Sequence, residues 1–433
     1  MYENDPQKEY QPDWVGGKRI DEVKLAKEYK EAAGLVYADG AFFTVDGRVT
    51  NEEGMRKVIY NAIKEYVRSG TTRRVESIMA ALRMEAHQDN FDNDPFVIHF
   101  KNGTYDLKYY FQEYKYPCRY RLPVNFNPNA KKPVKWLKFL DELLEPTDIL
   151  TLQEYMGYCL IPTTKAQKML MIIGRGGEGK SRIGVVMKAL LGESMSIGSL
   201  AKVETNSFAR ADLEHLLLFV DDDMKMEGLP GTNYIKSIIT AELPMDLERK
   251  GKQSYQGKLN VRFLAFGNGN LQALNDRSHG FFRRQIILQA KPRPEDRVDN
   301  PDLTNEFMKE LEEIMVWAVL GLVRLMEQNF KFTISDQAKN NLLDAVNQSN
   351  NIVSFMKSEG YFIFSTDGTV TSRSLYKTYV DWCEDNMMTP LSASVFWNYF
   401  KQEASFYHLK PSNHIPIGNG KQARGFIGMR IIR

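Results

Sequence analysis

The sequence predicts an α/β protein with a central parallel sheet, an α+β segment before it and a small helix-and-hairpin domain after it. At residues 169–191 an apolar run, a glycine-rich loop and a helix-forming stretch follow one another. Further apolar runs between residues 216 and 288 each end next to polar or charged side chains. After residue 347, two amphipathic stretches precede two strand-like runs. Strands that alternate with helices are typical of parallel sheets.

The glycine-rich loop matches the pattern G-x-x-x-x-G-K-[ST] at residues 174–181. Its glycines allow backbone amides to turn inward around an anion, and the following helix adds the positive end of its dipole. The loop therefore predicts a nucleoside triphosphate site, with Lys180 at the β- and γ-phosphates and Ser181 as a Mg²⁺ ligand. The residues expected to contact the nucleotide are Gly174, Gly176, Gly177, Glu178, Gly179, Lys180, Ser181 and Arg182.

Three acids follow the next buried strand, residues 216–220. The carboxyl end of such a strand lies beside the glycine loop in a parallel sheet. We expect Asp221 to hold the Mg²⁺ and Asp222 to polarise the attacking water. The sequence does not fix which carboxylate points inward, and Asp223 is an alternative for either role.

A polar residue and two arginines complete the predicted site. Asn268 ends the apolar run 261–267 and is expected to act as a sensor that hydrogen-bonds the γ-phosphate or the water. Arg283 and Arg284 precede another apolar run, and one of them is expected to stabilise the transition state, often across a subunit boundary. A surface ion pair is the alternative for these arginines. The sequence does not show whether Arg283 or Arg284 has the catalytic role.

A basic loop at residues 246–254 lies between the acids and Asn268. Arg249, Lys250 and Lys252 surround Gly251, which favours a projecting turn with a positive tip. In a ring-shaped ATPase such a loop can hold the DNA backbone. A solvated turn is the alternative.

The C-terminal residues have the layout of a winged helix. Helices are expected at 372–386 and 393–403, and strands at 414–417 and 425–432. From Lys401 onward there are six Lys and Arg residues against the single acid Glu403. We expect Lys401, Lys421 and Arg424 to contact DNA, because clustered cations neutralise phosphates; a packing domain is the alternative.

Composition sets the class of protein but not its partner. The 433 residues carry a net charge of +2, so a DNA site must come from local clustering. Three scattered cysteines predict neither zinc nor disulfides, and we expect a cytoplasmic protein without a membrane span. The expected domains are an α+β domain at 1–130, a helical collar at 131–165, the core at 166–295, a helical lid at 296–346 and the winged helix at 347–433.

The order and spacing of these motifs resemble superfamily 3 helicases, in particular the phage and plasmid primase-helicase family related to poxvirus primase-helicases. The resemblance covers about residues 166–290, and extends to 100–107, 154–162 and 379–386. It implies a AAA+ P-loop ATPase core, a homo-hexameric ring and 3′→5′ unwinding of DNA. It assigns Lys180 and Ser181 to Walker A, Asp221 and Asp222 to Walker B, Lys250 and Lys252 to the pore hairpin, Asn268 to sensor 1, and Arg283 or Arg284 to the finger.

The chain departs from this family in two respects. Gly251 occupies a place in the basic loop where relatives often have a larger residue, and the N-terminal part has neither zinc cysteines nor a primase metal triad. We therefore expect no primase activity.

The predicted function is an ATP- and Mg²⁺-dependent replicative helicase and initiator of a phage or mobile element, acting on single- and double-stranded DNA with replication proteins of its host. One alternative is an origin-binding initiator that uses ATP only to assemble and melt DNA. Another is an ATPase that acts on a protein substrate.

Overall fold

The computed structural model describes residues 12–16, 19–89, 91, 94–108, 111–224, 231–251, 253–268, 279–294, 296, 298–349, 351–388 and 390–432. The side chains of 268, 279, 347–349 and 402 are outside that description. The chain folds into two compact units, one made mainly of residues up to Ala338 and the other mainly of residues from Lys339 onward. The finer domain boundaries predicted above stay predictions.

The N-terminal part of the first unit consists of three helices and short antiparallel strands. Asp21 caps the first helix by accepting a hydrogen bond from the amide of Lys24, and Gly34 ends it with a φ of 57°. The pattern of residues 42–49 predicts a hairpin, and the pairing of β4 with β5 confirms it. The elements are β1 (Val15–Gly16), β2 (Arg19–Ile20), α1 (Glu22–Ala33), β3 (Val36–Ala38), β4 (Ala41–Thr44), β5 (Gly47–Arg48), α2 (Glu52–Ile63) and α3 (Thr71–Glu85).

A second antiparallel sheet and two helices lead to the glycine loop. The Asn-Gly pair at 102–103 predicts the turn of a hairpin here; the hairpin forms, but its turn is Lys101-Asn102, because Phe100 pairs with Gly103 and Gly103 begins β7. Both helices were predicted within a few residues. The elements are β6 (Val97–Phe100), β7 (Gly103–Asp106), β8 (Phe111–Gln112), α4 (Val134–Leu143) and α5 (Pro146–Tyr158).

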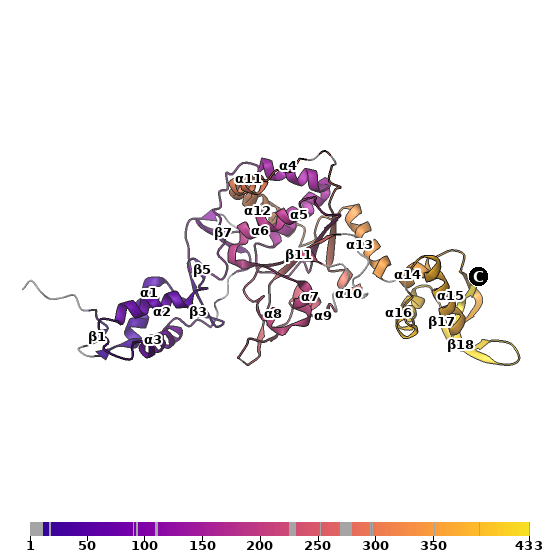
Figure 1. Cartoon of the computed structure of the whole chain (residues 1–433), viewed down its shortest axis with the longest axis horizontal. Helices are drawn as coiled ribbons and strands as arrows, with labels where there is room; N and C mark the ends of the chain where they lie inside the picture. Colours follow the sequence, from indigo (N-terminus) through magenta and orange to yellow (C-terminus); the bar gives the residue numbers. More distant parts are fainter. Residues whose placement is uncertain are drawn as a thin grey trace, which may run out of the picture. The chain divides into compact units, whose positions relative to one another are not determined.

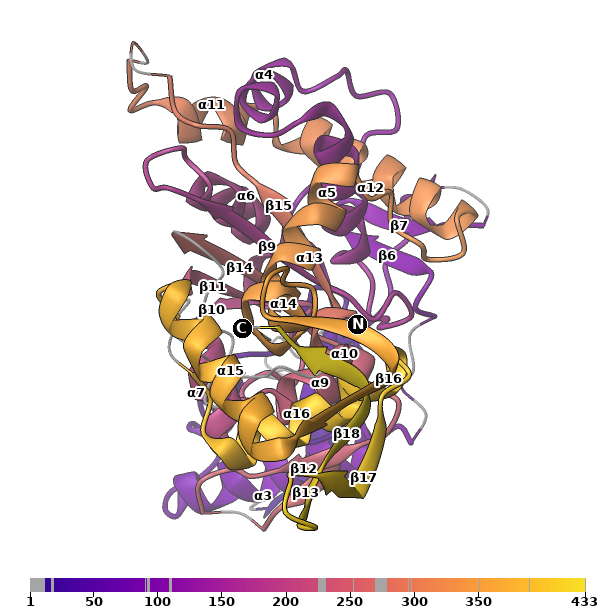
Figure 2. The same cartoon turned by 90° about the vertical axis from the view of Figure 1, so that its right-hand side faces the viewer.

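A five-stranded parallel sheet forms the centre of the first unit, with strand order β10-β11-β14-β9-β15 (Figure 2). The glycine-loop strand β9 pairs with β14 on one side and β15 on the other, and every residue of β9 is buried. This confirms the predicted α/β class. The strands are β9 (Met169–Gly174), β10 (Met195–Ile197), β11 (Leu218–Met224), β14 (Arg262–Asn268) and β15 (Gln285–Gln289).

Short helices and one hairpin connect these strands. In Figure 1, α7, α8 and α9 lie on one side of the sheet, and α4, α5, α6, α11 and α12 gather on the other. The connecting elements are α6 (Ser181–Leu191), the 3₁₀ turn Gly192–Ser194, α7 (Leu200–Thr205), α8 (Ser207–Ala211), α9 (Asn233–Thr240), β12 (Met245–Leu247), β13 (Tyr255–Gly257) and α10 (His279–Phe282).

The apolar periodicity of residues 303–329 predicts one long helix, but the structure has two. The segment divides at Glu310 into α11 (Leu303–Lys309) and α12 (Leu311–Glu327). The carboxylate of Glu310 accepts hydrogen bonds at 2.9–3.0 Å from the amides of Lys135 and Trp136. These amides open α4, which has no side-chain cap of its own. The break therefore allows a residue distant in sequence to cap another helix.

Helices α5 and α12 cross in close contact because a glycine of each lies at the crossing. A Cβ at Gly157 would lie 2.3 Å from the carbonyl oxygen of Ala318, and a Cβ at Gly321 would lie 2.3 Å from that of Gln153. The fully buried Glu154 carboxylate accepts hydrogen bonds from Arg324 (2.7 Å) and from the amide of Thr333 (2.8 Å). Backbone proximity and a buried ion pair together fix α12 behind the sheet.

Replacing Gly321 by Ala is expected to lower the free energy of unfolding by about 2–4 kcal/mol, because the added methyl forces the two helices apart. Gly54→Ala is the matched control, since its Cβ would meet only ordinary contacts of 3.5 Å or more within α2. Urea unfolding followed by far-ultraviolet circular dichroism measures both. Equal midpoints for the two variants would contradict the tight crossing.

The second unit is a three-stranded antiparallel sheet, ordered β16-β18-β17, packed with helices (Figure 2). The two predicted helices and the two predicted strands are confirmed with shifted ends, while β16 was not predicted. Ser335 accepts a hydrogen bond from the amide of Ala338 and caps α13, as expected. The elements are α13 (Asp336–Ser349), α14 (Asn351–Met356), β16 (Phe362–Thr371), α15 (Ser372–Asp385), α16 (Ala393–Phe406), β17 (Lys410–Pro416) and β18 (Gln422–Ile431).

Across the described ranges, no helix combines the length and apolarity that a membrane crossing requires.

Candidate functional site: an anion-binding loop and its cavity

The glycine loop connects β9 to α6 and turns through backbone conformations that favour glycine. Gly176, Gly177 and Gly179 have φ values of 106°, 81° and 102°. A Cβ at Gly174 would lie 2.7 Å from Nζ of Lys180, so a larger residue there would displace the side-chain ends of Lys180 and Glu178. The sequence therefore dictates the tight curvature that aims amides at one point.

The carboxylate of Glu178 occupies the centre of this curvature. It accepts hydrogen bonds from the amides of Arg175 and Gly176 and, at 2.7 Å, from Nζ of Lys180. The side chains of Glu178 and Lys180 are only 3% and 6% exposed. Burial alone would raise the pKa of the Glu178 carboxyl, but the hydrogen bonds from Lys180 and the loop outweigh it and lower the pKa. The loop thus binds an anionic group, which here belongs to the chain itself.

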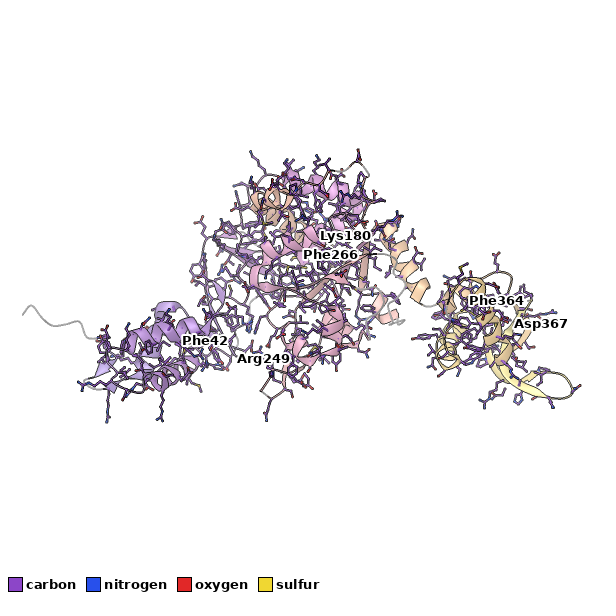
Figure 3. All side chains as sticks on the ribbon, viewed as in Figure 1. Phe42, Lys180, Arg249, Phe266, Phe364 and Asp367 are labelled. Carbon is purple, nitrogen blue, oxygen red and sulfur yellow. The ribbon has the colours of Figure 1, made fainter. Side chains whose placement is uncertain are left out.

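A cavity of about 990 Å³ opens beside the loop. Figure 3 shows Lys180 and Phe266, which both line it, close together in the first unit. One wall holds the predicted loop residues Gly176, Gly177, Gly179, Lys180, Ser181 and Arg182. The opposite wall comes from α4 and the segment after β15, and includes Lys135, Lys138, Phe139, Glu142, Arg293, Asp299, Asn300 and Glu306.

Of the two acids expected to act in the site, Asp222 lines the cavity. Asp221 is instead buried, and its carboxylate accepts a hydrogen bond at 2.8 Å from the amide of Leu200, which opens α7. Burial and the neighbouring charges of Asp223 and Asp222 raise the pKa of Asp221, although backbone hydrogen bonds oppose the shift. Pairing of β11 with β14 shifts register between Asp221 and Met224, and such a bulge re-aims side chains. The geometry therefore places the carboxylate of Asp222, and not that of Asp221, at the cavity, while the metal role expected for Asp221 stays a prediction.

Asn268 ends β14 and pairs in register with Gly174, the first residue of the glycine loop. Its backbone thus lies at the edge of the sheet where the loop begins. The orientation of its side chain lies outside the described structure, so the sensor role stays a prediction.

Arg284 lies at the end of the sheet where β9 begins, which is opposite the end that carries the glycine loop. The amide of Met169, which opens β9, donates to the carbonyl of Arg284 at 2.8 Å, and Gln285 pairs with Met169. The length of β9 separates this point from the loop by about 17 Å at about 3.3 Å per residue. The backbone of Arg284 is therefore far from the chain's own loop, and the finger role of Arg283 or Arg284 stays a prediction.

The basic loop forms the tip of the hairpin β12–β13, in which Leu247 pairs with Tyr255. Arg249 donates to the carboxylate of Glu214, and the hydroxyl of Tyr255 donates to the same group at 2.6 Å. Lys250 is exposed, whereas Lys252 lies outside the described residues. An internal ion pair thus occupies Arg249, and Lys250 is better placed for DNA.

In the second unit the expected DNA contacts are all exposed. Lys401 lies on α16, Lys421 lies just before β18, and Arg424 lies near the start of β18. Their roles stay predictions.

The part of the cavity lining that comes from α4 and the segment after β15 could not be recognised in the sequence. Lys135 and Lys138 are one helical turn apart on α4, and Arg293 follows β15 in a proline-containing stretch that was taken as a break. Only the 3-residue spacing of the two lysines was visible in advance, and it does not distinguish a binding wall from a solvated face.

Comparisons with known proteins extend to nearly the whole chain at the level of fold. An apo structure of the NrS-1 C-terminal region (A form) matches with a TM-score of 0.52 and 12% identity, covering 90% of this chain and 88% of that chain. A second apo structure of the same region gives a TM-score of 0.53 and 9% identity, covering 95% and 100%. The chain has the fold of the NrS-1 C-terminal region.

Two family models match parts of the sequence. Residues 23–145 match "D5 N terminal like", and residues 172–284 match a family of unknown function (DUF5906). No curated protein matches the chain in sequence. The D5-like match lies upstream of the glycine loop, and the DUF5906 match includes it. The assignment to superfamily 3 stays a prediction.

Proposed function

We propose that this chain is an ATP-dependent DNA helicase and replication initiator of a phage or mobile element, built on a AAA+ P-loop core. One observation carries the proposal: the loop already holds a carboxylate between its amides and Lys180, in a cavity that Asp222 also lines. A phosphate group is an anion of the same kind, and it bonds to inward amides and a lysine in this way.

The roles follow from position. Lys180 would hold the β- and γ-phosphates after Glu178 has given way, and Asp222 would orient the attacking water. Ser181 is exposed at the start of α6 and lines the cavity with Asp222, so the pair offers the oxygen ligands that Mg²⁺ prefers. Mg²⁺ would neutralise charge on the phosphates. Because Arg284 lies at the far edge of the sheet, we propose that Arg283 or Arg284 acts on the nucleotide of a neighbouring subunit in a ring.

DNA contact is assigned to two places. The hairpin β12–β13 presents Lys250 at its tip, which suits a backbone grip that moves with the nucleotide state. The second unit has the helix and sheet order of a winged helix, and its exposed Lys421 and Arg424 suit contact with duplex phosphates. We propose an origin-binding role for this unit.

The deciding experiment is ATP-dependent unwinding of a 3′-tailed forked duplex by the full chain. Strand displacement that needs ATP and a 3′ tail supports the helicase. ATP-dependent oligomers that melt a duplex without displacing a strand would replace it with the melting initiator. ATPase activity that DNA does not stimulate would favour a protein substrate.

Replacing both Lys421 and Arg424 by Ala is expected to weaken duplex binding at all sequences alike. Each lost phosphate contact reduces the slope of log K against log salt by about 0.9. Fluorescence anisotropy at several salt concentrations measures the slope, with an exposed pair in the first unit, Lys57→Ala and Arg68→Ala, as the control. A slope equal to that of wild type would remove these residues from the interface.

Glu178→Gln is expected to tighten ATP binding about tenfold, which corresponds to about 1.4 kcal/mol. The triphosphate must displace the Glu178 carboxylate from the amides and Lys180, and a neutral amide competes less strongly for both. Isothermal titration calorimetry of the full chain gives the Kd. Weaker binding by Glu178→Gln would indicate that the carboxylate shapes the loop instead of competing with phosphate.

A further inference from the structure

Arg293 reaches the glycine loop from the opposite wall of the cavity. It follows β15, and its Nη1 atom lies 3.6 Å from the point that a Cβ at Gly177 would occupy. Arg293 lines the same cavity as Lys180 and Ser181. A cation of the same chain therefore lies beside the loop, on a segment for which neither the sequence motifs nor the family matches give a role.

In the present structure Arg293 is paired with Asp299, with Nη2 3.1 Å from Oδ1. The side chains are 37% and 72% exposed. Exposed ion pairs contribute little to stability because water screens them and both side chains lose freedom. Arg293 therefore loses little free energy when it leaves Asp299 for a more highly charged partner.

Three other cations of the cavity already have partners within the chain. Lys180 is bonded to Glu178, Arg182 donates to the hydroxyl of Thr304 at 2.7 Å, and Lys135 lies 3.6 Å from Glu306. A polyphosphate brings several negative charges, and arginine matches phosphate with two parallel hydrogen bonds where lysine offers a point charge. Arg293 combines this chemistry with proximity to the loop and a weakly held partner.

We infer that Arg293 binds the phosphate chain of the nucleotide in cis. While the site contains no nucleotide, Arg293 stays paired with Asp299. This inference rests on the proposed function and adds a second cation to it. It also makes the segment after β15 a wall that responds to bound phosphate.

The test measures affinity for ATP, ADP and AMP by displacement of a fluorescent ATP analogue from the full chain. Arg293→Gln is expected to weaken ATP about 10- to 30-fold and AMP by less than about 3-fold, because a phosphate contact is lost in proportion to the phosphates present. Arg293→Lys is expected to recover part of the loss, and Asp299→Asn to tighten ATP by about 2- to 5-fold. Arg68→Gln, an exposed arginine of the N-terminal part, is the control and is expected to change nothing.

The outcomes separate this inference from the function on which it rests. Failure of the wild type to bind ATP overturns both. Binding by the wild type with an equal loss for all three nucleotides in Arg293→Gln overturns the inference alone, because a residue that only supports the wall does not sense phosphate number. Unchanged ATP affinity in Arg293→Gln, or weaker ATP binding by Asp299→Asn, also overturns it.

Discussion

Lys180→Ala is expected to lower kcat for ATP hydrolysis by about 10²- to 10³-fold, the usual cost of removing one group that stabilises charge in a transition state. Lys180 is 6% exposed, and its Nζ donates to the Glu178 carboxylate inside the curve of the glycine loop. Duplex binding is expected to persist, since the proposed duplex contacts lie in the second unit. Steady-state phosphate release and anisotropy on the same preparation measure the two properties.

The design must separate lost chemistry from a damaged loop. Removing Lys180 leaves the buried Glu178 carboxylate without its cation, and an unpaired buried charge is destabilising. The double variant Lys180→Ala with Glu178→Gln keeps the loop neutral and is expected to remain inactive while recovering thermal stability. Lys202→Ala, an exposed lysine on α7, is the control. Activity in the double variant within about tenfold of wild type would exclude Lys180 from the chemistry.

The parts of this site that the sequence predicted are those contained in one short stretch of chain. The glycine loop needs positive φ at Gly176, Gly177 and Gly179, and only glycine adopts those values freely. The residue types alone therefore predict the backbone conformation of the loop. The hairpin near Asn102 and Gly103 was predictable from the Asn-Gly pair, a common turn dipeptide, although the pairing shifts the turn by one residue. Alternating apolar runs and loops also sufficed for the parallel sheet.

The parts that the sequence did not predict depend on contacts between distant segments. Glu310 breaks a continuous helical pattern because it caps α4, about 175 residues earlier, and no local signal marks such a partner. The cavity wall that contains Lys138 and Arg293 forms only when α4 and the segment after β15 meet. Glu178 occupies a variable position of the loop motif, so its inward carboxylate was not predictable from the pattern.

The sequence also did not predict how the acids at the end of β11 are oriented. Their orientation leads to different predictions for Asp221 and Asp222. Asp222→Asn is expected to lower kcat by about 10²- to 10³-fold with little change in ATP affinity, because its carboxylate lines the cavity and would act on water and Mg²⁺. Asp221→Asn is expected to keep kcat within about tenfold. Its buried oxygen accepts from the amide of Leu200, and an amide oxygen can accept the same bond.

The two variants are also expected to differ in thermal stability. Burial raises the pKa of Asp221, so its ionised form is disfavoured in the folded protein, and a neutral Asn removes that cost. We therefore expect Asp221→Asn to unfold at the same temperature as wild type or a higher one, and Asp222→Asn, at an exposed position, to be unchanged. Phosphate release and thermal unfolding on both variants provide the measurement. If Asp221→Asn loses hydrolysis and Asp222→Asn retains it, the metal role expected for Asp221 holds and the water-polarising role of Asp222 does not, and the carboxylate of Asp221 must leave Leu200 when nucleotide binds.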